Sequence, residues 1–170
     1  MPNTFTLIQT LTAGAGGQSE FDFTSIPQTY TDLVLKFSLR ITTGGYDSTP
    51  WVTGRLRFNG STFPTSAKQL YGTGSATGSD TNLAPVFMED TDGTASIFGN
   101  GEIYIPNYTS TASKAISVDV IGENNATASL AVLWSGLNTL ASAITSITIF
   151  QDGYTIAQHS SASLYGIKNS

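Results

Sequence analysis

The sequence has no cysteine and only one histidine. Without cysteine the chain can form no disulfide, no zinc–thiolate site and no cysteine nucleophile. The one histidine, His159, would have to serve any Ser-His-Asp site, and no G-x-S-x-G segment is present to supply an activated serine. An exposed or hydrogen-bonded histidine near a strand end is the simpler interpretation, and we expect that the protein is not an enzyme.

Charge is also scarce in this chain. Asp, Glu, Lys and Arg make up 11% of the 170 residues, against about 25% in an ordinary globular protein. Seven basic residues and a net charge of −5 remove the electrostatic attraction on which nucleic-acid binding depends, so no nucleic-acid partner is expected. Serine and threonine supply about a quarter of the chain, which predicts a neutral surface rich in hydroxyl groups.

Long hydrophobic runs and a secretory signal are missing as well. The uncharged stretch Ala126 to Phe150 is interrupted by nine serine, threonine and asparagine side chains, too many for a helix in hydrocarbon. It is better interpreted as two strands around a loop. The first ten residues, MPNTFTLIQT, have neither a basic n-region nor a continuous apolar h-region. We therefore expect no membrane contact. We also expect that the protein functions in the compartment where it is made, or is carried out as part of a larger particle.

What the chain does contain is a repeated alternation of apolar and polar residues. In DLVLKFSLRIT, residues 32–42, five large apolar side chains occupy every second position, which predicts a strand with one buried face. Similar inward rows occur in WVTGRLRF, residues 51–58, and around Val118, Trp134 and Ile149. Hydrophobic residues make up 39% of the chain, enough to supply a core.

These rows predict an all-β fold of roughly ten to twelve short strands, at the spacing typical of a sandwich or barrel. We predict one antiparallel β-sandwich, jelly-roll-like, that spans residues 1–170. The closing segment SASLYGIKNS predicts a last strand, with Leu164 directed to the core and Tyr165 to the opposite face. Because that strand would fix the C-terminal end, residues 1–17 are expected as a possible N-terminal arm.

The segment MEDTDG is the strongest candidate for a chemical function, because it contains three carboxylates, Glu89, Asp90 and Asp92. Carboxylates two residues apart followed by glycine can begin a calcium loop, and paired carboxylates can serve glycoside hydrolysis. The segment lacks the later bidentate glutamate of an EF-hand, and Asp-Gly is a turn dipeptide in its own right. A turn is the favoured interpretation, with a bound cation and catalysis left as weaker alternatives.

Several aromatic residues are candidates for contact with a partner or a ligand. Trp51, Tyr71, Tyr104 and Tyr108, together with Tyr46, lie near loops or out of phase with the apolar rows. Aromatic rings in such places can stack on sugars or become buried in a subunit interface, although ordinary packing explains them equally well.

No cofactor is expected. The glycine-rich segments GAGG, residues 14–17, and GTGSATG, residues 72–78, match neither the dinucleotide-binding nor the P-loop pattern. Neither precedes a helix whose N-terminus could hold a phosphate. They are interpreted as flexible loops.

Three segments together resemble the small all-β virion proteins of tailed bacteriophages. They are FDFTSIPQTYTDLVLKFSLR (residues 21–40), LRFNGSTFPTSAKQLYGTGS (residues 56–75) and the closing ITSITIF…SASLYGIK (residues 144–168). The shared pattern is an F-x-F-x-S-I-P-x-x-Y-x-x-L entry, an L-R-F-N-G segment and an S-x-S-L-Y-G-I end. The resemblance covers most of the chain, but residues 81–113 have no counterpart in it.

This resemblance implies a β-sandwich located in the virion and transfers no catalytic residue. The leading hypothesis is a capsid decoration or cement protein, a trimer that binds the major capsid protein or another virion protein and stabilises the head. The alternative is a tail-fibre or receptor-binding module for host polysaccharide, with Trp51, Tyr71 and the Glu89–Asp92 segment as its sugar-binding candidates. A glycan-cleaving enzyme is the least favoured class, because no acid pair can be placed.

Overall fold

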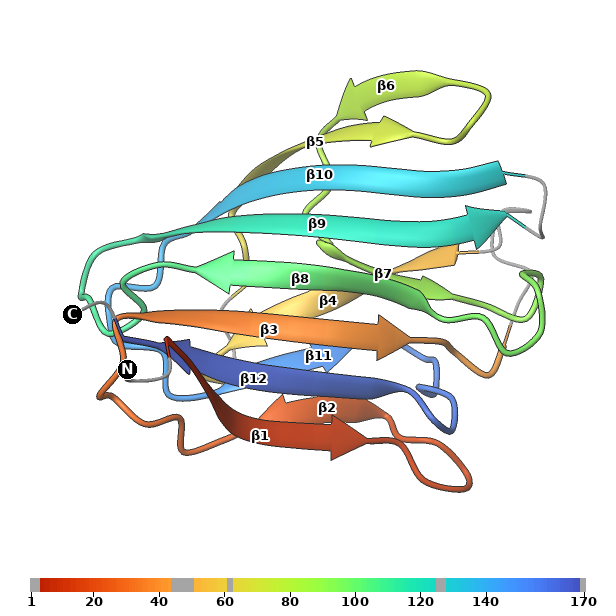
Figure 1. Cartoon of the computed structure of the whole chain (residues 1–170). Helices are drawn as coiled ribbons and strands as arrows, with labels where there is room; N and C mark the ends of the chain where they lie inside the picture. The colour runs from red at the N-terminus through yellow and green to blue at the C-terminus, as the bar shows by residue number, and fades with distance from the viewer. Residues whose placement is uncertain (1–3, 44–50, 61–62, 125–127, 169–170) are drawn as a thin grey trace.

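Two β-sheets packed face to face make up the fold of this protein. The structure is a computed structural model that describes residues 4–43, 51–60, 63–124 and 128–168, and every regular element in these ranges is a strand. The twelve strands form two antiparallel sheets, with the larger sheet in front of the smaller one in Figure 1. The predicted all-β sandwich is confirmed. Within the same ranges, no helix has the length and hydropathy needed to cross a membrane.

The strands divide eight and four between the sheets. The larger sheet contains, in spatial order, β1 (Phe5–Thr12), β12 (Ser161–Ile167), β3 (Asp32–Leu39), β8 (Gly99–Ile105), β9 (Lys114–Asn124), β10 (Ala128–Asn138), β5 (Ser66–Gly72) and β6 (Thr77–Asp80). The smaller sheet contains, again in spatial order, β2 (Glu20–Phe23), β11 (Ile147–Phe150), β4 (Trp51–Phe58) and β7 (Val86–Glu89). The larger sheet is wider than the smaller one, and its β5–β6 end extends above the smaller sheet in Figure 1.

The core lies between the sheets and is built from the alternating rows. In β3 the side chains of Leu33, Leu35 and Leu39 are fully buried, whereas Lys36 between them is exposed. The inward row of β10 lies opposite the inward row of β9 in register, with Trp134 paired to Val118. Each buried side chain of this size stabilises the fold by about 1.5–3 kcal/mol relative to an exposed one.

One apolar residue on the outward face of β3 is buried too. Val34 is only 1% exposed, although it alternates with the core row. Its cross-strand neighbours are Tyr104 on β8 and Tyr165 on β12. Aromatic side chains beside a β-branched residue are a favourable cross-strand combination, and here they account for the burial of Val34.

The two end strands of the chain lie side by side. Leu164 is fully buried and Tyr165 only partly, so both have the orientation expected from the sequence. β12 is not at the edge of its sheet, because β1 pairs with its free side, with an irregularity between Leu7 and Gln9. Residues 5–12 of the segment expected as an arm thus form an edge strand, which pairs with β12 on one side and leaves its other side without a strand partner among the described residues.

Candidate functional site

The MEDTDG segment folds as a turn that follows β7. Glu89 and Asp90 are fully buried, whereas Asp92 is exposed. The Asp90 carboxylate accepts a hydrogen bond from the backbone N–H of Asp92, with 2.8 Å between the atoms. An aspartate that binds the backbone two residues later is a common turn stabiliser, so the favoured interpretation of this segment is confirmed.

Glu89 is a buried carboxyl group with a strongly shifted pKa. Burial is the largest cause and raises the pKa of Glu89 from 4.5 to about 7. The backbone N–H of Glu123 donates to Oε1 of Glu89 at 2.7 Å, and this bond opposes part of the shift, as does the charge of Arg40. Burial also raises the pKa of the neighbouring Asp90. Both side chains therefore favour the protonated, neutral form more than an exposed carboxyl group does.

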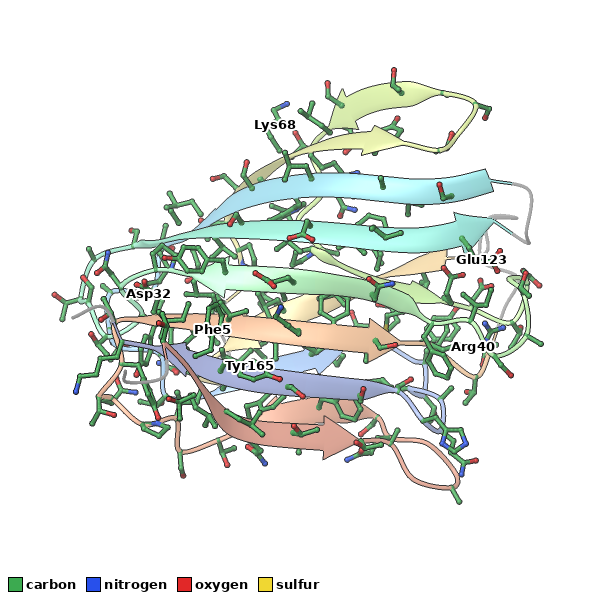
Figure 2. All side chains as sticks on the ribbon, in the orientation of Figure 1. Phe5, Asp32, Arg40, Lys68, Glu123 and Tyr165 are labelled. Atoms are coloured by element: carbon green, nitrogen blue, oxygen red, sulfur yellow. The ribbon has the colours of Figure 1, made fainter. Side chains whose placement is uncertain are left out.

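Residues 93–97 are held by Glu123 of β9 and by Arg40, which directly follows β3. The Arg40 guanidinium donates to the carbonyl oxygens of Thr94 and Ile97, at 3.0 and 2.7 Å. The Glu123 carboxylate accepts the backbone N–H of Thr94 at 2.5 Å. Figure 2 shows Arg40 and Glu123 at the same end of the sheet, opposite the end that carries Asp32. The charged groups here fix a loop, which is a structural role.

The three carboxylates do not converge on one point. Glu89 bonds to β9, Asp90 bonds within its own turn and Asp92 is exposed. In the part of the chain that the structure describes, no group of three or more histidine, aspartate or glutamate side chains could hold a metal ion. His159 lies exposed in the loop before β12. The calcium-loop alternative therefore gains no support from the geometry.

Two of the aromatic candidates, Tyr104 on β8 and Tyr108 in the turn after β8, differ in accessibility. Tyr108 is fully buried, and its hydroxyl donates to the carbonyl of Pro27. It has no surface to offer a partner, which corrects its assignment as a contact residue. Tyr104 is 36% exposed, and its hydroxyl donates to Asp32 at 2.9 Å. This hydrogen bond and, to a lesser degree, burial raise the pKa of Tyr104.

The residues proposed for a sugar site do not form one. Tyr71 lies on β5 in the larger sheet, partly buried against the core, whereas Glu89 is buried at the end of β7 in the smaller sheet. Trp51 opens β4, but its side chain lies outside what the structure describes, and Tyr46 lies outside the described residues altogether. The sugar site expected from these residues has no support in the described geometry.

The most distinctive surface is a group of exposed apolar side chains on the outer face of the larger sheet, which we call the outer patch. Its members are Leu70 on β5, Ile121 on β9, and Leu133 and Leu137 on β10, and they are 59%, 53%, 59% and 39% exposed. In Figure 1 this face is turned to the viewer, and no other segment lies over it. Leu70, Ile121 and Leu133 occupy neighbouring positions on three adjacent strands and form one surface. Leu137 lies farther along β10, beyond Ser135 and its cross-strand partner Lys68.

Strand register fixes the geometry of the outer patch. Leu133 lies directly opposite Leu70, and Ile121 lies opposite Ala131 two residues before Leu133. These three large side chains line a groove of about 730 Å³. Lys68 precedes Leu70 by two residues and so lies on the same face, at the upper end of the sheet in Figure 2. A lysine beside apolar surface leaves the patch with a polar border.

Sequence reasoning missed the outer patch, although a signal was present. In ASLAVLWSGLN the inward row is Leu130, Val132 and Trp134, and the polar phase between them nevertheless contains Leu133 and Leu137. Large apolar residues at both the odd and the even positions of a strand indicate that both of its faces contact other groups. The signal could not show that leucines from two strands meet, because Leu133 on β10 and its partner Leu70 on β5 are 63 residues apart in the chain.

Comparison with known proteins adds no relative to this description. No family model matches the chain, and no curated protein or solved structure matches it significantly. The fold itself, an antiparallel β-sandwich, is therefore the only class to which the chain is assigned.

Proposed function

We propose that the chain is a structural protein of a bacteriophage virion, a capsid decoration or cement protein that binds the outer surface of the head. The outer patch carries this proposal, because contiguous exposed apolar side chains mark protein–protein contacts on soluble proteins. The sequence resemblance to small virion proteins supports the virion as the proposed location. The major capsid protein or another virion protein is the proposed partner, and a trimer is the proposed assembly.

The proposed mechanism is simple contact. Each Å² of apolar surface removed from water stabilises the contact by roughly 25 cal/mol, and the outer patch offers four large side chains for this. The chain has few charged groups, so little charge has to lose its hydration when the patch is covered. Repetition of one modest contact over a symmetric shell gives strong overall attachment.

Replacing Leu133 with glutamate should prevent incorporation of the protein into virions while leaving its fold intact. Leu133 is 59% exposed, so the new carboxylate stays in water in the free protein and loses that water only in the contact. We expect occupancy on particles to fall at least about tenfold, which corresponds to about 1.4 kcal/mol of binding free energy. Quantitative mass spectrometry of purified particles measures the occupancy.

The matched control is Gln158→Glu, which adds the same charge at an exposed loop position away from the outer patch. It should be incorporated like the unmodified protein and should unfold at the same urea concentration. Leu133→Glu places its carboxylate opposite Asp119 on β9, so its free energy of unfolding should fall by less than about 1 kcal/mol. Full occupancy of the Leu133→Glu variant would remove the outer patch as the attachment surface.

A further inference from the structure

A second concave surface lies on the smaller sheet. Its floor includes Thr53 and Arg55 of β4, which alternate with the buried core residues of that strand and therefore face away from the larger sheet. Loops that contain Phe63, Leu83 and Asp152 form its walls. The cleft has a volume of about 960 Å³, within the range of sites that bind small organic ligands.

One side of the cleft is an apolar wall held in place by ring contacts. Phe63 is 37% exposed, and its ring centre lies 6.2 Å from that of Phe150. The guanidinium of Arg57 lies over the Phe150 ring at 4.7 Å and also bonds to Glu20, which fixes the far side of the stack. Leu83, 49% exposed, extends the apolar wall.

Arg55 and Asp152 supply the polar part of the cleft, and their charges balance. The Arg55 guanidinium also lies over the Phe63 ring, 6.0 Å from its centre, so the polar groups adjoin the apolar wall. Nε of Arg55 lies 2.8 Å from the Asp152 carboxylate, and both side chains are more than half exposed. A guanidinium has five N–H donors and a carboxylate about four acceptor positions, so a single bond between them leaves donors and acceptors for a ligand. Because the two charges compensate each other, the pair favours a neutral partner over an anion or a cation.

A ligand that fits both walls needs an apolar face and several hydroxyl groups but no net charge. Sugar rings have this combination, with C–H groups on one face that pack on aromatic rings and hydroxyl groups around the edge. A purely apolar ligand would cover the remaining donors of Arg55 and acceptors of Asp152 without bonding to them, and an anion would be repelled by the Asp152 carboxylate.

We propose that this cleft binds a neutral saccharide, with Phe63 and Leu83 against the face of a sugar ring and Arg55 and Asp152 bonded to its hydroxyl groups. The proposal goes beyond attachment to a capsid. The outer patch lies on the outer face of the larger sheet, and the cleft lies on the opposite side of the sandwich. A molecule attached by the outer patch therefore keeps the cleft open to solvent, where it can bind sugars outside the particle.

The test is a binding measurement with the full chain and a defined set of neutral oligosaccharides: maltopentaose, cellopentaose, mannopentaose and chitopentaose. Heparin pentasaccharide serves as the anionic comparison. Saturation-transfer NMR and calorimetry at millimolar concentration should show saturable binding of at least one neutral oligosaccharide and weaker binding of heparin. Phe63→Ala should weaken the neutral binding about tenfold, because it removes the stacking surface.

A second variant, Asp152→Ala, tests the charge balance, since it leaves Arg55 without its partner and should raise the affinity for heparin while lowering that for the neutral sugar. The Phe63 and Asp152 side chains are both exposed, so both variants should keep the fold, and thermal unfolding verifies this. Leu133→Glu is the control that must retain saccharide binding, which separates this site from virion attachment. Absence of binding by every neutral oligosaccharide, stronger binding of heparin by the unmodified protein, or unchanged binding by Phe63→Ala overturns the proposal.

Discussion

Replacing Lys114 with methionine should lower the free energy of unfolding by about 3 kcal/mol, one of the two largest effects that we expect from a single substitution. Lys114 is only 1% exposed. Its ammonium group donates to the carbonyl oxygens of Ser110 and Ala112, at 2.7 and 2.5 Å. The carbonyl oxygens of Leu140 and Ser142 also lie within hydrogen-bond distance of it, at 3.3 and 3.1 Å. Since an ammonium group has three N–H donors, at least two of the four carbonyls share one of them.

These four carbonyls belong to two different connections of the larger sheet. Ser110 and Ala112 lie between β8 and β9, and Leu140 and Ser142 lie between β10 and β11, so one side chain joins segments far apart in sequence. Burial lowers the pKa of Lys114, because loss of hydration disfavours the charged ammonium group. Methionine keeps the length of the side chain but leaves the carbonyls without a donor.

Urea unfolding followed by tryptophan fluorescence measures this effect, since Trp134 is fully buried in the core. Lys68→Met is the matched control, because Lys68 is exposed on β5 and the change there should stay within about 0.5 kcal/mol. A Lys114→Met variant as stable as the unmodified protein would mean that the cost of burying the ammonium group equals the gain from its hydrogen bonds.

The second large effect is a loss of stability as the pH rises. Glu89 has a pKa of about 7 in the folded protein against an ordinary value of 4.5, so between these values the folded state binds more protons than the unfolded state. Stability is then highest at the acidic end of this window, falls as the pH rises through it, and levels off above the folded pKa. The shift corresponds to about 3 kcal/mol between its two ends. Burial also raises the pKa of Asp90, so its contribution to the pH dependence has the same sign and begins above its ordinary value.

Glu89→Gln should remove most of this pH dependence. The amide oxygen can still accept the N–H of Glu123, and the variant should be more stable than the unmodified protein near about pH 8 and similar to it near about pH 5. The groups that face Glu89, namely Arg40, Glu123 and Asp90, remain in place. Urea unfolding at both pH values measures the difference.

The control for this experiment is Glu102→Gln on the outer face of the larger sheet. Glu102 bonds to Lys36 at 2.9 Å and is partly exposed, so its loss should destabilise by less than about 1 kcal/mol at both pH values. If the unmodified protein keeps the same stability across the window, or gains stability as the pH rises, burial of Glu89 does not have the assigned effect.

The strand pattern was predictable from sequence because a period of two reflects a purely local property. The rows that contain Leu35, Leu56, Val118 and Ile149 all face the core as predicted. The order of the strands was not predictable, because pairing depends on contacts between distant segments. The position of β12 between β1 and β3 illustrates this, since both partners are much earlier in the chain.

The burial of particular polar and aromatic groups could not be predicted from the sequence either. Tyr108 and Glu89 both look like surface residues in a list of amino acids, and both are fully buried. Each is buried because another segment covers it: Tyr108 bonds to Pro27, and Glu89 bonds to the backbone of Glu123. The saccharide cleft was missed for the same reason, because Phe63 and Asp152 meet only when the loops after β4 and β11 come together.

Location and copy number in the purified particle test the central claim most directly. A reconstruction of the virion, combined with quantitative mass spectrometry, gives both. The account predicts on the order of hundreds of copies on the outer capsid surface, as symmetric repetition requires, with Leu133 and its neighbours of the outer patch in the contact. A few dozen copies or fewer, confined to the tail or its fibres, would contradict it.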